Sequence, residues 1–109
     1  MFVLRLNHLD IRTAALAIAE AARRRRRDDS LARASRRLAD RLHEALPVTL
    51  ARGEAYLDVP DEEAFLLRDA LADACDGWSI AGPFRYRAQA QSLPFTRPEA
   101  LLARLGAEA

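Results

Sequence analysis

Apolar residues recur at every second position at the start of the chain, at Phe2, Leu4 and Leu6. A period of two predicts a short strand with one buried face. Asp10 follows shortly afterwards. Its carboxylate can accept hydrogen bonds from the exposed amides of a first helical turn, so we expect Asp10 to cap a helix.

Two helical patterns of opposite phase follow this strand, over residues 11–46, which contain neither glycine nor proline. The residues that share a face are Ile11, Ala15, Ile18 and Ala22 in the first pattern, and Leu31, Leu38, Leu42 and Ala45 in the second. At about 100° per residue, the two faces lie on roughly opposite sides of a continuous helix. One long helix would have to change its buried side halfway along. We therefore favour an antiparallel helical hairpin with a break near residues 28–30, where Asp29 or Ser30 begins the second helix.

Pro47 is expected to end the hairpin, because proline removes a backbone donor and clashes with the preceding turn. Residues 48–51 and 55–59 are rich in apolar and β-branched side chains, and they predict two short strands around a turn at 52–54.

A third helix is predicted from Pro60, since acidic residues fill its first turn and favour the positive end of the helix dipole. Its expected apolar residues are Phe65, Leu67, Leu71 and Cys75. Gly77 is the predicted end of this helix.

The last part of the chain predicts one more strand and one more helix. Residues 84–91 alternate between apolar and polar side chains, which is typical of a strand with one packed face. Residues 96–99 have the sequence of a capping box that opens a helix through Leu105, closed by Gly106.

These elements predict an α+β fold, with a helical hairpin and two further helices packed on one face of a small, mainly antiparallel sheet. We expect one domain over residues 1–109, with the hairpin at about 10–46 and the strand and helix portion at about 47–105.

Charge is divided between two segments, although the formal net charge is only +1. Residues 23–41 hold nine arginines and three acids, and residues 58–76 hold seven acids and one arginine. The residues that we expect to bind a partner come from both segments: Arg23, Arg24, Arg25, Arg26, Arg27, Arg33, Arg37, Arg41, Asp61, Glu62, Asp69 and Asp73.

Several interpretations of these charged segments stay open. They could form a solvated surface, they could pair within one chain, or the arginines could neutralise phosphates of a nucleic acid. They could also join two proteins, and the partner could be a second copy of the chain. The absence of aromatic anchors beside the arginines argues against a membrane surface.

Candidate catalytic chemistry is weak along the whole sequence. His8 and His43 come without a set of three or four ligands at metal-binding spacing, and Cys75 has no neighbouring histidine to activate it. The four glycines are scattered and form no phosphate-binding loop. We therefore expect no enzyme activity, no cofactor and no metal.

The sequence predicts a soluble, cytoplasmic protein, because a single cysteine suits a reducing compartment and no stretch has the roughly 20 apolar residues of a membrane helix. The predicted function is a non-enzymatic protein–protein interaction module that could assemble with itself through complementary basic and acidic surfaces. The alternative is a small nucleic-acid-binding or regulatory protein that uses the arginine-rich hairpin on phosphates.

Overall fold

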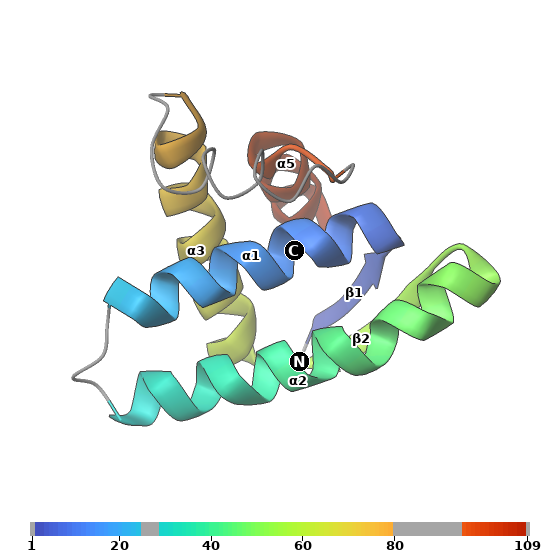
Figure 1. The fold of residues 1–109 in the computed structure, drawn as a ribbon, viewed down its shortest axis with the longest axis horizontal. Helices are drawn as coiled ribbons and strands as arrows, with labels where there is room; N and C mark the ends of the chain where they lie inside the picture. The colour runs from blue at the N-terminus through green and yellow to red at the C-terminus, as the bar shows by residue number, and fades with distance from the viewer. Residues whose placement is uncertain (1, 25–28, 80–94, 109) are drawn as a thin grey trace.

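The computed structural model describes residues 2–24, 29–79 and 95–108, and within these ranges the chain is a mostly helical α+β fold (Figure 1). The elements, in chain order, are β1 (Phe2–Leu6), α1 (His8–Arg24), α2 (Asp29–Arg52), β2 (Ala55–Val59), α3 (Asp61–Ser79) and α5 (Pro98–Glu108). The predicted fold class, helices combined with a small antiparallel sheet, is confirmed. The strand predicted over residues 84–91 lies outside the described residues.

The sheet pairs β1 with β2 in antiparallel register, so that Phe2 lies opposite Val59 and Leu6 lies opposite Ala55. Leu6 and Val59 are fully buried, whereas Tyr56 on the other side of the sheet is exposed. The strands predicted at the start of the chain and over residues 55–59 are therefore confirmed. One face of this small sheet belongs to the core and the other meets solvent, which is the usual result of alternating side chains.

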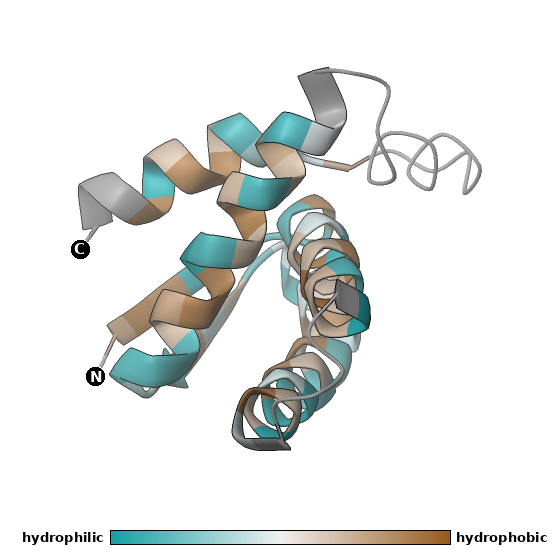
Figure 2. Cartoon of the chain, turned by 90° about the vertical axis from the view of Figure 1, so that its left-hand side faces the viewer, coloured by the Kyte–Doolittle hydropathy of each residue, from teal (hydrophilic) through white to brown (hydrophobic). Residues whose placement is uncertain are grey.

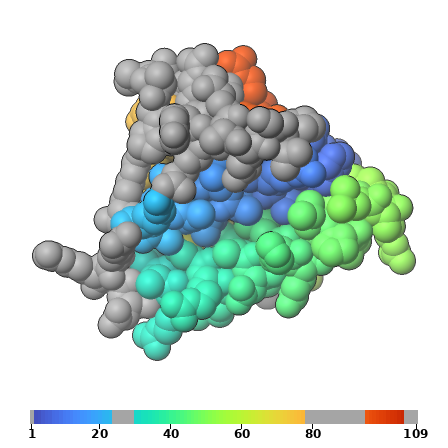
Figure 3. Space-filling view, viewed as in Figure 1, coloured from blue at the N-terminus to red at the C-terminus, as the bar shows by residue number. Residues whose placement is uncertain are grey.

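The helical hairpin is also confirmed, because α1 and α2 are separate helices that lie side by side (Figures 1 and 3). Apolar and polar residues alternate around each helix, as expected for helices with one buried side (Figure 2). Ile11 and Ile18 of α1 and Leu38 and Leu42 of α2 are buried in one common core. The change of phase in the sequence thus marks the point where the chain reverses direction.

The first helix begins differently from the prediction, because Asn7 and not Asp10 is its capping residue. The Asp10 amide donates to Asn7 Oδ1 at 2.9 Å, and the Asn7 amide donates to Asp10 Oδ2 at 2.9 Å. This reciprocal pair is a capping box, in which Asp10 occupies the third helical position. The Asn7 side chain thus satisfies the Asp10 amide, and the Asp10 carboxylate, which accepts from the Asn7 amide, can accept further hydrogen bonds.

The predicted end of the hairpin at Pro47 is wrong, and so is the strand predicted over 48–51. Helix α2 continues through Pro47 to Arg52, where Gly53 has a φ of 88° and donates its amide to the Thr49 carbonyl at 2.8 Å. Thr49 is buried in this last part of the helix, and its hydroxyl donates to the Leu46 carbonyl at 2.7 Å. Packing of these final turns outweighs the local cost of proline, and residues 52–54 connect a helix to a strand.

Replacing Pro47 by alanine is expected to stabilise the protein by about 1–3 kcal/mol, because the new amide can complete the hydrogen-bond ladder of α2. Pro47 is exposed, so the change removes little packing. Urea unfolding followed by circular dichroism measures the effect. Pro60→Ala is the matched control, since Pro60 precedes α3 and interrupts no helix, and no gain is expected there. An unchanged or lower stability of Pro47→Ala would contradict the prediction.

Helix α3 differs from its prediction at two points. It continues through Gly77 to Ser79, and Phe65, which the prediction grouped with Leu67 and Leu71 as an apolar residue of the helix, is exposed. Phe65 and the buried Leu67 are two residues apart, which places them about 200° apart around a helix, so they cannot share one face. Leu67, Leu71 and Ala74 share the buried side instead.

Helix α5 begins one residue later than the capping-box pattern predicts. The amides of Ala100 and Leu101 donate to the Arg97 carbonyl at 3.1 and 3.2 Å, so Arg97 is the residue that precedes the first helical position, Pro98. The Thr96 hydroxyl donates to Asp10 instead of capping the helix. The helix also runs through Gly106 to Glu108, so the predicted stop at Gly106 is wrong.

Candidate protein interface

Three of the predicted partner-binding arginines form a stripe along α2. Arg33, Arg37 and Arg41 are each one helical turn apart and therefore share a side of the helix. Arg33 and Arg37 are exposed, and Arg41 is partly buried. We refer to these three residues as the arginine stripe.

Two of the other predicted arginines, Arg23 and Arg24, belong to α1. Arg23 lies in the last turn of α1, and its Nη1 is 3.2 Å from Glu20 Oε1. Arg24 is the last residue of α1, and Arg25, Arg26 and Arg27 lie outside the described residues.

Five acidic residues share one side of α3 with an exposed phenylalanine. Phe65, Asp69, Ala72 and Asp76 follow one another at the spacing of a single helical face. The carboxylates of this outer side are Asp61, Glu62, Asp69, Asp73 and Asp76, and we refer to them together with Phe65 as the acidic face. The Phe65 side chain is 70% exposed, the largest exposure among the large apolar residues that the structure describes.

The arginine stripe and α3 meet within one chain at two ion pairs. Arg37 Nη2 lies 3.3 Å from Glu62 Oε1, and both side chains are mostly exposed. Arg41 Nη1 lies 3.4 Å from Glu63 Oε2, and Glu63 is buried. Two predicted residues, Arg37 and Glu62, are thus brought together, whereas Arg41 contacts a carboxylate that the sequence did not single out. An exposed pair such as the first contributes only ~0–1 kcal/mol.

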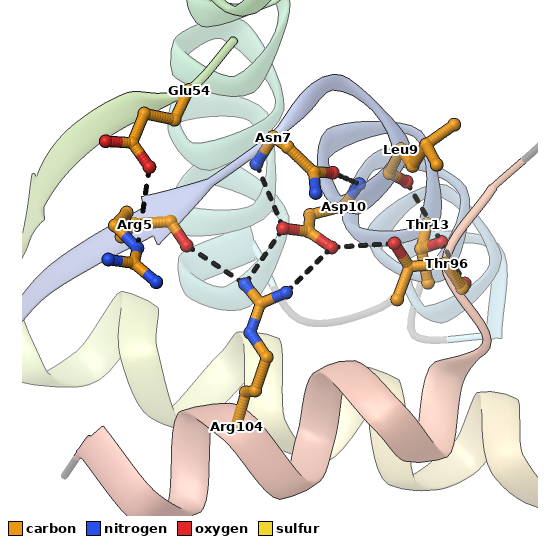
Figure 4. A network of polar contacts seen from close by, with 8 residues as sticks. All are labelled: Arg5, Asn7, Leu9, Asp10, Thr13, Glu54, Thr96 and Arg104. Carbon is orange, nitrogen blue, oxygen red and sulfur yellow. Dashed lines mark hydrogen bonds and ion pairs between the residues drawn. The ribbon is translucent and has the colours of Figure 1, made fainter.

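A buried polar network joins the two ends of the chain at Asp10 (Figure 4). Asp10 is 1% exposed. Arg104 of α5 donates to both of its carboxylate oxygens, at 3.2 Å to Oδ1 and 2.8 Å to Oδ2. The Thr96 hydroxyl donates to Oδ1 at 2.6 Å, and Arg104 Nη2 also donates to the Arg5 carbonyl at 3.0 Å. This network fixes α5 against β1 and α1.

The electrostatics of this network favour a charged Asp10. Burial alone would raise the pKa of Asp10, but hydrogen bonds from Arg104, Thr96 and the Asn7 amide, together with the Arg104 charge, lower that pKa below its ordinary value. Sequence reasoning identified Asp10 as a cap and missed Arg104. No local signal connects residues so far apart in the chain.

A shallow hollow of about 270 Å³ lies between α1 and α2. Most of the residues that line it are apolar: Ile11, Ala15, Leu16, Ala19 and Leu46. Arg12 and His43 are the two polar residues of the lining. The hollow is slightly smaller than a typical ligand pocket of roughly 300–1,000 Å³. It offers no nucleophile, and its single histidine has no carboxylate among the lining residues.

Cys75 and the histidines show no arrangement for catalysis in the described part of the chain. Burial raises the pKa of the Cys75 thiol, and the charges of Glu99 and Asp76 raise it further, so the thiol stays protonated and is a poor nucleophile. His8 lies at the start of α1, and His43 lies on α2. Within residues 2–24, 29–79 and 95–108, no group of three or more His, Cys, Asp or Glu side chains could hold a metal ion.

Comparisons with known proteins found no matching family model, no matching curated protein and no matching solved structure. Among the helices that the structure describes, none combines the length and apolar character that crossing a membrane requires.

Proposed function

We propose that the protein is a non-enzymatic interaction module whose acidic face binds an arginine-rich segment of a protein partner. The observation that supports this proposal is the exposure of Phe65, 70%, in the middle of a carboxylate-rich helical surface. Large aromatic side chains are the usual anchors of protein interfaces, where a ring of polar residues excludes water around them. An aromatic ring on the outer side of α3 contributes nothing comparable to the core.

The chemistry of the acidic face selects the class of partner. Carboxylates bind guanidinium groups through paired, charge-assisted hydrogen bonds, and guanidinium groups also stack on aromatic rings. The protein already makes the second kind of contact internally, because the Arg68 guanidinium lies 5.6 Å from the centre of the Phe2 ring. A partner with arginines beside apolar side chains would therefore match both components of the acidic face.

Binding of a labelled amphipathic peptide made of arginine and leucine, measured by fluorescence anisotropy, tests this proposal. We expect saturable binding that weakens at least tenfold in Phe65→Ser, because anchor residues typically contribute 2 kcal/mol or more, about 30-fold. Val48→Ser is the matched control, since Val48 is exposed on α2, away from the acidic face, and should leave binding unchanged.

Two results would contradict the proposed function. One is equal binding by the protein and by Phe65→Ser, and the other is equal binding of a peptide in which glutamate replaces every arginine. Unfolding curves of each variant establish that a loss of binding does not reflect a loss of fold. Phe65→Ser should unfold close to the unsubstituted protein, because its side chain is mostly in solvent already.

A further inference from the structure

We propose that the hollow between α1 and α2 is a binding site for a small organic anion, with the apolar body of the ligand in the hollow and its carboxylate at Arg12 and His43. Seven residues line this hollow, and none of them belongs to the acidic face of α3. The inference therefore goes beyond the proposed function and does not depend on it.

The hollow owes its shape to small side chains where α1 lies beside α2. The two helices run side by side along one face of the molecule (Figure 3). Ala15 and Ala19 are one helical turn apart on α1 and both line the hollow, whereas Leu16 and Leu46 contribute longer side chains. Alanine lacks the atoms that would fill the space between two helices, so an open depression remains there.

The size and the lining of the hollow limit the ligand to a small apolar body. Five of the seven lining residues are apolar, and covering their exposed parts removes apolar surface from water, which favours binding. An apolar cavity of about 150 Å³ holds benzene. The hollow, at about 270 Å³, therefore has room for two fused aromatic rings or a short alkyl chain.

The polar residues of the lining select a carboxylate. Arg12 is permanently charged and partly buried, so salt and solvent screen its charge less than that of a fully exposed arginine. A guanidinium group has five N–H donors in a planar fork, so Arg12 can bind a carboxylate in addition to contacts within the protein. The His43 imidazole supplies a further N–H donor in either protonation state. None of the lining residues is acidic, so no carboxylate of the lining competes with that of the ligand.

Isothermal titration calorimetry of the full chain with naphthoate, a bicyclic aromatic carboxylate, tests this inference. We expect saturable binding with a dissociation constant of about 1 mM or lower, because a ligand of this size reaches that affinity at an ordinary gain per atom. Naphthamide has the same rings without the charge, and it should bind about tenfold more weakly. Acetate has the charge without the rings, and it should not bind at the same concentrations.

Substitutions in the lining test the two parts of the site separately. Arg12→Met should weaken the binding of naphthoate about tenfold or more and change that of naphthamide much less, because it removes the charged donor and keeps an apolar side chain. Arg33→Met is the matched control, since Arg33 is exposed on α2 and does not line the hollow, and it should leave naphthoate binding unchanged. Ala19→Leu should abolish the binding of both compounds, because the larger side chain fills the hollow. Ala19 is exposed, so this change should not disturb the core.

Four results would contradict the proposed site, once unfolding curves show that each variant is folded. The first is a lack of saturable naphthoate binding. The second is an equal effect of Arg12→Met and Arg33→Met, which would indicate unspecific attraction of anions by arginines. The third is equal affinity for naphthoate and naphthamide, which would point to an uncharged occupant such as an apolar side chain of another protein. The fourth is binding that survives Ala19→Leu, which would place the ligand elsewhere on the molecule.

Discussion

Arg104→Met is expected to lower the free energy of unfolding by about 3 kcal/mol at neutral pH, because it leaves the buried Asp10 carboxylate without its charged partner. Removing one member of a buried ion pair typically costs about 3–5 kcal/mol, and the lower end applies here because Arg104 itself is 41% exposed. Methionine replaces most of the apolar stem of the arginine side chain, so the loss of stability reflects the missing charge more than lost packing. Chemical unfolding at neutral pH measures it.

The same variant should also change how stability depends on pH. Asp10 has a pKa below its ordinary value of 3.8 in the folded protein, so the unfolded chain binds a proton at higher pH than the folded chain does. The stabilisation is fully present above pH 3.8 and is lost as the pH falls through the folded pKa. The difference between the protein and Arg104→Met should therefore shrink in acid.

Arg97→Met is the matched control for this prediction. Arg97 precedes α5 and is mostly exposed, with Arg97 Nε lying 3.4 Å from Glu99 Oε1. The same substitution should cost less than about 1 kcal/mol there, because exposed ion pairs contribute little. Equal losses at Arg97 and Arg104, or a loss at Arg104 that persists unchanged at low pH, would show that the Asp10 network is not an important contributor to stability.

Leu42→Ala is expected to destabilise the protein by about 2–5 kcal/mol, because it removes a fully buried side chain and leaves a cavity between α1 and α2. Leu42 is 0% exposed and belongs to the common core. Thermal unfolding should show a midpoint lower by roughly 10 °C or more, which corresponds to a loss of 2 kcal/mol or more in a domain of this size.

Leu50→Ala makes the same chemical change in the same helix, at a side chain that is 62% exposed. It should leave stability within about 0.5 kcal/mol, because little apolar area returns to water. Comparable losses for the two variants would mean that the hairpin does not pack through Leu42.

Periodic patterns in the sequence determined the main elements of this fold. Alternation at Phe2, Leu4 and Leu6 predicted β1, since the side chains of a strand point to opposite faces whatever surrounds them. The reversal of the apolar phase after residue 22 predicted the hairpin, because one helix cannot bury two opposite sides against one core. Both inferences depend on local geometry alone.

Element ends were predicted less well, because they depend on what the last turns contact. Pro47 and Gly77 are local stop signals, but α2 and α3 continue beyond them. Burial of Thr49 compensates for the interruption at Pro47. Local sequence patterns do not show which helical turns become buried in the tertiary structure. Thr96 has the correct residue type for a cap, and a tertiary hydrogen bond to Asp10 uses its hydroxyl instead.

The charged segments show the same division between sequence and tertiary structure. Composition alone revealed a basic and an acidic segment, because charge is a property of the residues themselves. The sequence left open whether these segments meet. Packing of α3 against α2 decided that Arg37 lies beside Glu62 and that Phe65 is exposed to solvent. The Asp10–Arg104 pair joins residues 94 positions apart, and folding alone brings such distant residues together.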